Sequence, residues 1–227
     1  MSMTYAIPDV HGRLDLLTSA FEKIARNAAG VGATIVTLGD YVDRGPKSRD
    51  VIEFLMAWRS DTLRLVCLKG NHEAMMWEAC NGLCELDWWL VNGGSATLIS
   101  YGLTAHDEAD TNVVPEGHLA WIAALPKMHV DEHRVFVHAG VDPDLPLREQ
   151  NEQILLWKRY PQGADLGHGS RHVVHGHHGD PRAPRAGKCK TNLDGLAWRT
   201  GRLVIGVFDD DQPGGASEYL EVVGKPG

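Results

Sequence analysis

The sequence TIVTLGDYVDRG, residues 34–45, decides the class of fold. Its first five residues are mostly β-branched and apolar, which predicts a buried strand over residues 34–38. Gly39 ends that strand, and Pro46 opens a segment whose apolar residues recur at helical spacing. A strand that passes through a polar loop into a helix is the repeating unit of α/β folds, so we expect that class here.

The same unit occurs on either side of this stretch. Residues 4–7 predict a strand before an amphipathic helix over residues 13–28, and residues 63–68 predict a strand before a helix that begins near His72. We therefore expect a mostly parallel sheet with helices on its faces. In such sheets, ligands bind beyond the carboxyl ends of the strands.

The rest of the chain has a different pattern. Residues 82–125 contain no convincing strand and are expected to be mostly helical. The later part predicts further strands, at residues 134–137, 171–175, 189–193, 203–208 and 218–223. With 227 residues in all, we predict a single domain, residues 1–227, that carries a small helical insert at about 82–125.

Composition limits the partners. Thirty Asp and Glu residues against 22 Lys and Arg give a net charge of −8, which disfavours nucleic acid as a partner bound through a basic surface. No run of about 18 apolar residues predicts a membrane span, and the first residues do not resemble a secretory signal. We expect a cytoplasmic protein whose four cysteines are reduced.

The first two polar loops carry side chains of the kinds that bind metals and phosphate. Asp9 and His11 stand two residues apart, and a carboxylate with an imidazole suits Mn, Fe or Zn better than Ca. Asp40 and Asp43 follow the next strand; a carboxylate can bridge two metals, and Arg44 can donate two hydrogen bonds to phosphate oxygens. Taken alone, each loop also fits an ordinary turn with a surface ion pair.

Three more predicted strands end in the same way. Asn71 offers an amide oxygen and His72 a possible acid, although an Asn there also fits a helix N-cap. His138 and His177 follow strands of the second half, where a lone histidine would usually be structural. Five strand ends that all carry ligand-type side chains make coincidence improbable, so the sequence predicts a metal site.

These motifs resemble the signature blocks of metal-dependent serine/threonine phosphoprotein phosphatases, of the calcineurin-like metallophosphoesterase superfamily. In order along the chain they are Asp9-x-His11-Gly12, Gly39-Asp40-Tyr41-Val42-Asp43-Arg44-Gly45, Leu68-Lys69-Gly70-Asn71-His72-Glu73, His138-Ala139-Gly140 and Gly176-His177. The match covers roughly residues 5–208, and the chain is compact, as in bacterial and phage members. The resemblance implies a β-sandwich flanked by α-helices, with metals at one sandwich edge.

The resemblance also implies roles for individual residues and a cofactor of two divalent metal ions, Mn²⁺ first, with Fe or Zn as alternatives. The first metal would be held by Asp9, His11 and Asp40, and the second by Asp40, Asn71, His138 and His177. His72 would be the general acid and Asp43 its orienting partner. Arg44 and Arg159 would bind the phosphate, while a hydroxide bridging the two metals attacks phosphorus in line.

Some assignments depart from the family pattern or stay open. Pro8 stands where the family usually has glycine. His175 and His178 flank His177, and the Gly-His pattern favours His177 as the ligand. Arg159 is chosen because it follows a Leu-Trp segment, and Asp194 is expected to be structural.

The leading hypothesis is a serine/threonine-type metallophosphatase whose partner is a phosphorylated protein or peptide, with the oligomeric state left open. Asp43 and Glu73 favour this reading over the alternative, a dinucleoside polyphosphate hydrolase of the diadenosine tetraphosphatase type. A non-catalytic metal-binding scaffold is disfavoured because every expected ligand and His72 are present. The acidic charge argues against a nuclease.

Overall fold

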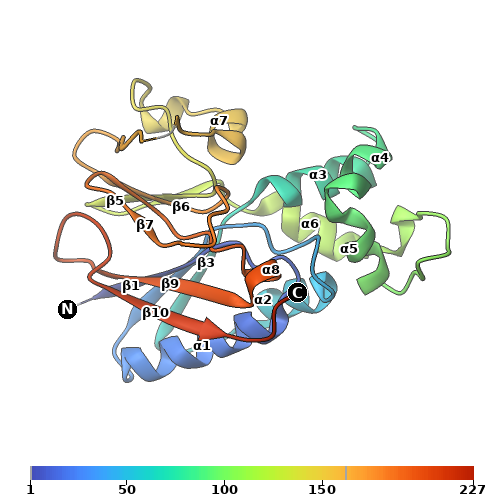
Figure 1. Cartoon of the computed structure of the whole chain (residues 1–227), viewed down its shortest axis with the longest axis horizontal. Helices are drawn as coiled ribbons and strands as arrows, with labels where there is room; N and C mark the ends of the chain where they lie inside the picture. The colour runs from blue at the N-terminus through green and yellow to red at the C-terminus, as the bar shows by residue number, and fades with distance from the viewer. Residues whose placement is uncertain (1, 162) are drawn as a thin grey trace.

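Two five-stranded sheets stack against each other in the computed structural model, which describes residues 2–161 and 163–227 (Figure 1). The first sheet has the order β10-β9-β1-β2-β3 and the second the order β4-β5-β6-β8-β7. The strands of the first sheet are β1 (Met3–Ile7), β2 (Ala33–Thr37), β3 (Leu63–Cys67), β9 (Arg202–Asp209) and β10 (Glu218–Val223). Those of the second are β4 (Met128–Val130), β5 (Arg134–Val137), β6 (His172–His175), β7 (Arg185–Ala186) and β8 (Lys190–Asn192).

Both sheets have parallel centres. Strands β1, β2 and β3 are parallel, as expected, because helices α1 (Leu14–Ala28) and α2 (Ser48–Ala57) carry the chain back between them. Strands β5, β6 and β8 are also parallel, whereas the remaining strands β4, β7, β9 and β10 pair antiparallel. The carboxyl ends of the central strands therefore meet at one edge of the sandwich.

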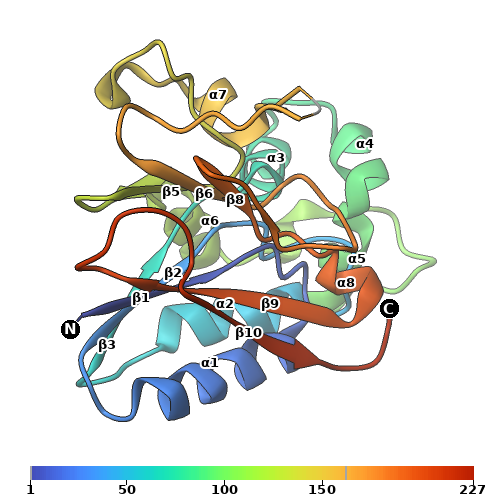
Figure 2. The ribbon, with the colours of Figure 1, turned by 60° about the vertical axis from the view of Figure 1, so that its left-hand side comes forward.

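Helices cover the outer faces of the sandwich (Figure 2). Leu17, Phe21 and Ile24 form the buried stripe of α1, which packs on the first sheet beside α2. The second sheet is covered on its outer side by α3 (Asn71–Cys80) and α7 (Glu152–Trp157), with Leu155 and Leu156 buried against its strands. This layering confirms the expected α/β sandwich.

The space between the sheets is filled by side chains from both. Val36, Val174, Phe136 and Phe208 are fully buried there, and the rings of Phe136 and Phe208 meet edge to face at 5.5 Å. Strands that are buried on both faces have nearly continuous apolar sequences. Their positions could therefore be predicted from the sequence.

The segment over residues 82–125 is helical where it is regular. It contains α4 (Leu86–Trp89), η1 (Leu90–Gly94), α5 (Ser95–Ser100), η2 (Thr111–Val113) and α6 (Glu116–Ala124). It lies at the same end of the sandwich as the carboxyl ends of β1 and β2 (Figure 1). The sequence missed short elements instead, namely β4, β7, η3 (Leu147–Glu149), α7 and α8 (Ala197–Thr200). Elements of two to six residues offer few positions from which a period can be read, so they are easily missed.

Among the residues that the structure describes, no helix combines the length and apolarity needed to cross a bilayer.

Candidate metal centre

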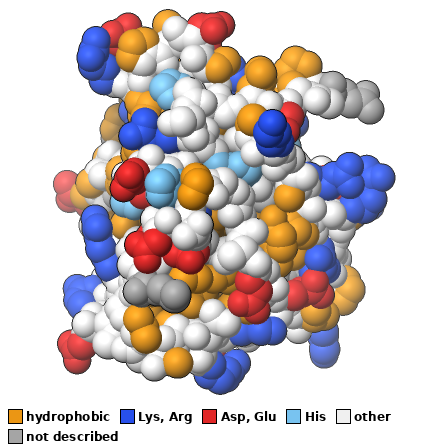
Figure 3. Space-filling view, turned by 90° about the vertical axis from the view of Figure 1, so that its left-hand side faces the viewer, with side chains coloured by type: hydrophobic (Ala, Val, Ile, Leu, Met, Phe, Trp, Pro, Cys, Tyr) orange, Lys and Arg blue, Asp and Glu red, His pale blue; other side chains and the backbone are white. Residues whose placement is uncertain are grey.

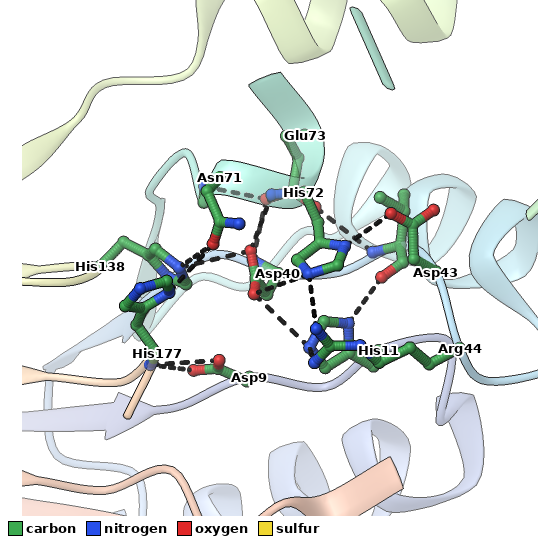
Figure 4. A network of polar contacts seen from close by, with 12 residues as sticks. Asp9, His11, Asp40, Asp43, Arg44, Asn71, His72, Glu73, His138 and His177 are labelled. Carbon is green, nitrogen blue, oxygen red and sulfur yellow. Dashed lines mark hydrogen bonds and ion pairs between the residues drawn. The ribbon is translucent and has the colours of Figure 1, made fainter. Parts of the chain in front are cut away.

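The strand-end loops converge at one edge of the sandwich, and with them come the side chains that the sequence singled out (Figure 4). They arrive from five places in the chain: Asp9 and His11 after β1, Asp40, Asp43 and Arg44 after β2, Asn71 and His72 at the start of α3, His138 after β5 and His177 after β6. Most are fully buried. The tertiary structure thus assembles one polar cluster from residues up to 168 positions apart.

Asp40 occupies the centre of this cluster. Its Oδ2 lies 3.4 Å from Nε2 of His11 and 3.9 Å from Nε2 of His72, while its Oδ1 lies 3.4 Å from Nε2 of His138. The two carboxylate oxygens therefore face different imidazoles. This is the arrangement that a carboxylate shared between two cations requires.

The tautomers of two histidines are set by backbone carbonyls. His11 donates from Nδ1 to the carbonyl of Val42 at 2.8 Å, and His138 donates from Nδ1 to the carbonyl of Leu38 at 2.9 Å. Because Nδ1 carries the hydrogen in each ring, the lone pair of Nε2 points toward Asp40. Metal-binding histidines are characteristically held in this way.

Two groups of side chains have the spacing of metal ligands. His11, Asp40 and His72 offer ligand atoms within 4.8 Å of one another, and so do Asp40, His138 and His177. Asn71 joins the second group, since its Oδ1 lies 2.8 Å from Nε2 of His138. Asp40 belongs to both groups.

Asp9 lies beside the two closely spaced groups and contacts the fifth loop. Both of its carboxylate oxygens accept from the backbone N–H of His177, at 3.1 Å, so that the first group of closely spaced ligand atoms contains His72 in its place. A Cβ at Gly176 would collide with this carboxylate, which gives the Gly-His pattern of the fifth loop a packing reason.

The electrostatics of the cluster favour cations. Burial raises the pKa of Asp40 well above its ordinary value, and the neighbouring charge of Asp9 adds to the shift. Burial likewise lowers the pKa of His138 to about 3, so its imidazole is neutral. The charge of Arg44 opposes the raised pKa of Asp40 only in part, and divalent cations would supply the remaining positive charge. Nδ1 of His177 lies 3.1 Å from Oδ1 of Asn71, so this imidazole meets the other ligand atoms and the residues fit a pair of metal ions.

Backbone strain concentrates at the same place. Seven non-glycine residues in the described part of the chain have positive φ, and five of them are His11, Asp40, Asp43, Arg44 and His177. Such conformations cost about 1–3 kcal/mol each and persist where the surrounding structure enforces them, typically at functional sites.

A second polar group borders the ligands. His72 donates from Nδ1 to Oδ2 of Asp43 at 2.6 Å, and both side chains are buried. Arg44 donates to Nε2 of His72 at 2.9 Å and to Nε2 of His11 at 2.8 Å. Burial lowers the pKa of His72, and the hydrogen bond to Asp43 opposes this shift.

Comparison with protein families decides the relationship. The family model for calcineurin-like phosphoesterases matches residues 4–205. The chain is a calcineurin-like phosphoesterase. The superfamily expected from the motifs is confirmed.

Relatives of this phosphoesterase include symmetrical bis(5′-nucleosyl)-tetraphosphatases. A symmetrical bis(5′-nucleosyl)-tetraphosphatase from Pseudomonas fluorescens (strain Pf0-1) is 32% identical over 148 residues, covering 64% of this chain and 44% of the relative. The chain thus spans about half the length of that relative.

Solved structures share the fold of this phosphoesterase. A candidate diadenosine tetraphosphatase superposes with a TM-score of 0.68 at 20% identity, covering 99% of this chain and 95% of the other. A serine/threonine protein phosphatase from Saccharomyces cerevisiae superposes with a TM-score of 0.58 at 16% identity, covering 99% and 81%.

The phosphoesterase site also contains positioning residues that the sequence did not reveal. Thr97 donates from Oγ1 to Oδ1 of Asp43 at 2.7 Å, and Trp89 donates from Nε1 to Oδ2 of Asp43 at 3.0 Å. Both come from the helical segment over residues 82–125, where no local pattern marks them. The carboxylate of Glu73 accepts the backbone N–H groups of Asp40 and Tyr41, at 2.8 and 2.7 Å, so its local role is to hold the second loop.

The residues left open by the sequence differ in burial: Arg159 is exposed, His178 is half-buried and His175 is fully buried. Arg159 follows α7 and its side chain is exposed. Burial is the main cause of the lowered pKa of His177, and the nearby charge of Arg159 adds to the shift. His178 lies 2.8 Å from the carbonyl of Lys158, and Nδ1 of His175 lies 2.9 Å from the carbonyl of Gly176. The group formed with Asp40 and His138 thus contains His177.

Proposed function

We propose that this chain, acting as a single domain, hydrolyses dinucleoside tetraphosphates symmetrically and releases two nucleoside diphosphates. The observation that carries the proposal is the 32% identity to a symmetrical bis(5′-nucleosyl)-tetraphosphatase over 148 residues. The paired ligand groups that share Asp40 support the chemistry. This ranking reverses the order expected from sequence, in which a phosphoprotein came first.

Two divalent metal ions would be held by the cluster. Asp9, His11 and Asp40 would bind one, and the other would be bound by Asp40, Asn71, His138 and His177. We propose Mn²⁺ first, with Fe or Zn as alternatives, because the donors are carboxylate oxygens and imidazole nitrogens. When bound, the ions polarise the phosphoryl oxygens and lower the pKa of water.

The chain's own groups would place and protonate the substrate. Arg44 and Arg159 would donate to the phosphoryl oxygens and offset the charge that develops there. Once Arg44 donates to the substrate in place of Nε2 of His72, that nitrogen would be free to hold a proton for the leaving oxygen, and Asp43 would fix the ring through Nδ1.

A direct comparison of substrates tests the proposal. Purified protein with Mn²⁺ is assayed against diadenosine tetraphosphate and a phosphoserine peptide, and the nucleotide products are separated by chromatography. We expect faster turnover of the dinucleotide with ADP as the product. Faster turnover of the peptide, or release of AMP with ATP, would reject symmetrical tetraphosphate hydrolysis.

A phosphoprotein substrate is the second candidate. The buried pair of His72 and Asp43, 2.6 Å apart, favours it, because an oriented acid matters most when the leaving group is a poor one such as a serine alkoxide. Glu73, which counted toward this reading, accepts backbone N–H groups of the second loop and so no longer separates the two substrates.

Charge supports small anionic substrates over nucleic acid. On the face shown in Figure 3, the basic side chains of the described residues are scattered among acidic and uncharged ones and form no continuous stripe. The net charge of −8 also opposes non-specific binding of nucleic acid. We propose a cytoplasmic protein that acts on a soluble nucleotide.

A further inference from the structure

A second cavity lies beside the metal centre, on the far side of Arg44. It has a volume of about 630 Å³, within the range of small-molecule sites. Its lining includes Pro46, Ala96, Ile99, Trp198 and Pro226, so its walls are largely apolar. Pro46 comes from the loop before α2, and the others come from α5, α8 and the C-terminal segment, which lie side by side in Figures 1 and 2.

The cavity walls are tied together by one buried side chain. Arg13 donates to the carbonyl of Ala197 at 3.2 Å and to the carbonyl of Lys225 at 2.8 Å, and its charge is balanced by Asp15. The wall that carries Trp198 is thereby fixed to the loop that follows β1. A site that is already formed loses little freedom when a ligand enters it.

Arg44 connects this cavity to the predicted catalytic residues. Its guanidinium carbon lies 5.6 Å from the ring centroid of Trp198, while its nitrogens contact His11 and His72 (Figure 4). A phosphate held by Arg44 would therefore have the indole of Trp198 as its neighbour. The Nε1 group of Trp198 is buried and finds no hydrogen-bond partner in the described part of the chain.

The chemistry of the cavity selects its occupant. An aromatic ring with aliphatic walls suits a flat, weakly polar group, and the exposed Lys225 in the lining suits the negative charge attached to it. The other cavities of comparable size near the centre are lined by Lys190, His178 and Asn192 and are polar. A nucleobase joined to a phosphate chain meets both requirements of the Arg44 cavity.

We propose that this cavity is a nucleobase subsite, in which the base of one nucleoside diphosphate unit stacks on Trp198 while its phosphates contact Arg44. The inference rests on the proposed function, because only a nucleotide substrate brings a base to this place. It makes Trp198 and Ile99 specificity-determining residues.

The test compares two inhibitors of the metal-loaded enzyme that share a diphosphate, ADP and inorganic pyrophosphate. The inhibition constants of both are measured against hydrolysis of 4-nitrophenyl phosphate. Trp198→Ala should raise the inhibition constant of ADP about tenfold more than that of pyrophosphate, the size expected from loss of one base-stacking contact. Trp198→Phe should restore most of the preference because it retains an aromatic face.

A matched pair of variants keeps the test valid if Trp198→Ala fails to fold. Ile99 is 46% exposed and lines the cavity, whereas Val91 is 82% exposed in the same helical segment and lies outside the lining. Ile99→Asp should weaken ADP relative to pyrophosphate, while Val91→Asp, with the same change of charge, should not.

Failure of the subsite and failure of the proposed function are distinguishable. An unchanged ratio of the two inhibition constants in Trp198→Ala and Ile99→Asp overturns the subsite, even if diadenosine tetraphosphate is hydrolysed. A ratio that shifts as expected supports the subsite. If diadenosine tetraphosphate is then not hydrolysed, the proposed reaction falls while a nucleotide site stands.

Discussion

Replacement of His72 by Asn separates the two candidate substrates. The imidazole is 2% exposed, donates from Nδ1 to Asp43 at 2.6 Å and is contacted by Arg44 at 2.9 Å. Asn keeps a polar side chain at this position and removes the titratable proton. The variant should therefore lose proton donation to the leaving group while the surrounding loops stay in place.

The expected magnitude depends on the leaving group. For a phosphoserine peptide the leaving oxygen is an alkoxide that needs a proton, so kcat/KM should fall by about 10²–10⁴-fold. For a tetraphosphate the leaving group is the terminal phosphate of a nucleoside diphosphate, and such a phosphate has a pKa of about 6. It departs near neutral pH without a proton, so the loss should stay below about tenfold.

The assay measures kcat/KM of wild-type and His72→Asn enzyme on both substrates, together with the metal content of each protein. Metal content should not change, because His72 is assigned as an acid although it lies within ligand distance of Asp40 and His11. His118→Asn is the matched control. Like His72, His118 is a buried histidine, but its side chain bonds to the hydroxyl of Tyr101 and not to the residues of the metal centre.

Two results would refute the reasoning. Equal losses on ester and anhydride would show that His72 does not act through the leaving group. A loss of metal from His72→Asn would assign this residue as a ligand, in agreement with the spacing of His11, Asp40 and His72.

Three further outcomes follow from the same contacts. Asp40→Asn should lower the affinity for both metals by more than about 100-fold. Replacing a residue that only orients a metal ligand already lowers metal affinity by about 10–100-fold, and Asp40 would be a ligand itself. Titration of metal by calorimetry measures the affinity. Thr97→Val removes a donor to the buried carboxylate of Asp43 and should lower the free energy of unfolding by about 1–3 kcal/mol in urea titrations. Burial lowers the pKa of His118, so as pH falls below about 6.5 the unfolded chain takes up a proton before the folded one does, and stability should fall; His118→Gln should reduce this fall in thermal unfolding scans.

Each of these predictions has its own control. Metal binding by Asp40→Asn equal to wild type would remove Asp40 as the shared ligand. Thr97→Ser keeps the hydroxyl and should preserve most of the stability that Thr97→Val loses; equal losses would assign the effect to packing. If wild-type protein and His118→Gln lose the same stability between pH 7 and pH 5, the expected role of His118 is contradicted.

The strand ends were predictable because their signal is local. A buried strand of the β2 kind is an apolar run that stops at a turn residue, and Asp40 follows such a stop. Spacing alone also predicted α1, whose apolar stripe needs no distant information. The short elements β7 and α8 were missed because two or four residues carry no period, and their positions depend on strands supplied by other parts of the chain.

The order of the two candidate substrates was predicted less well than the strand ends. Glu73 was used to favour a phosphoprotein, yet its carboxylate accepts the N–H groups of Asp40 and Tyr41. An acidic residue that looks functional in sequence can serve the backbone of a distant loop. The relatives, which are named as symmetrical tetraphosphatases, then favour the dinucleotide.

By itself, the sequence determined the α/β class, the five strand-end loops and the kinds of atoms that they offer to a metal. Tertiary structure alone decided that Asp40 faces His11 with one oxygen and His138 with the other, and that Thr97 holds Asp43. The reason is physical: residue type and local period are properties of neighbours along the chain, whereas these contacts join residues separated by 29 to 98 positions and exist only once two sheets and a helical segment have packed together.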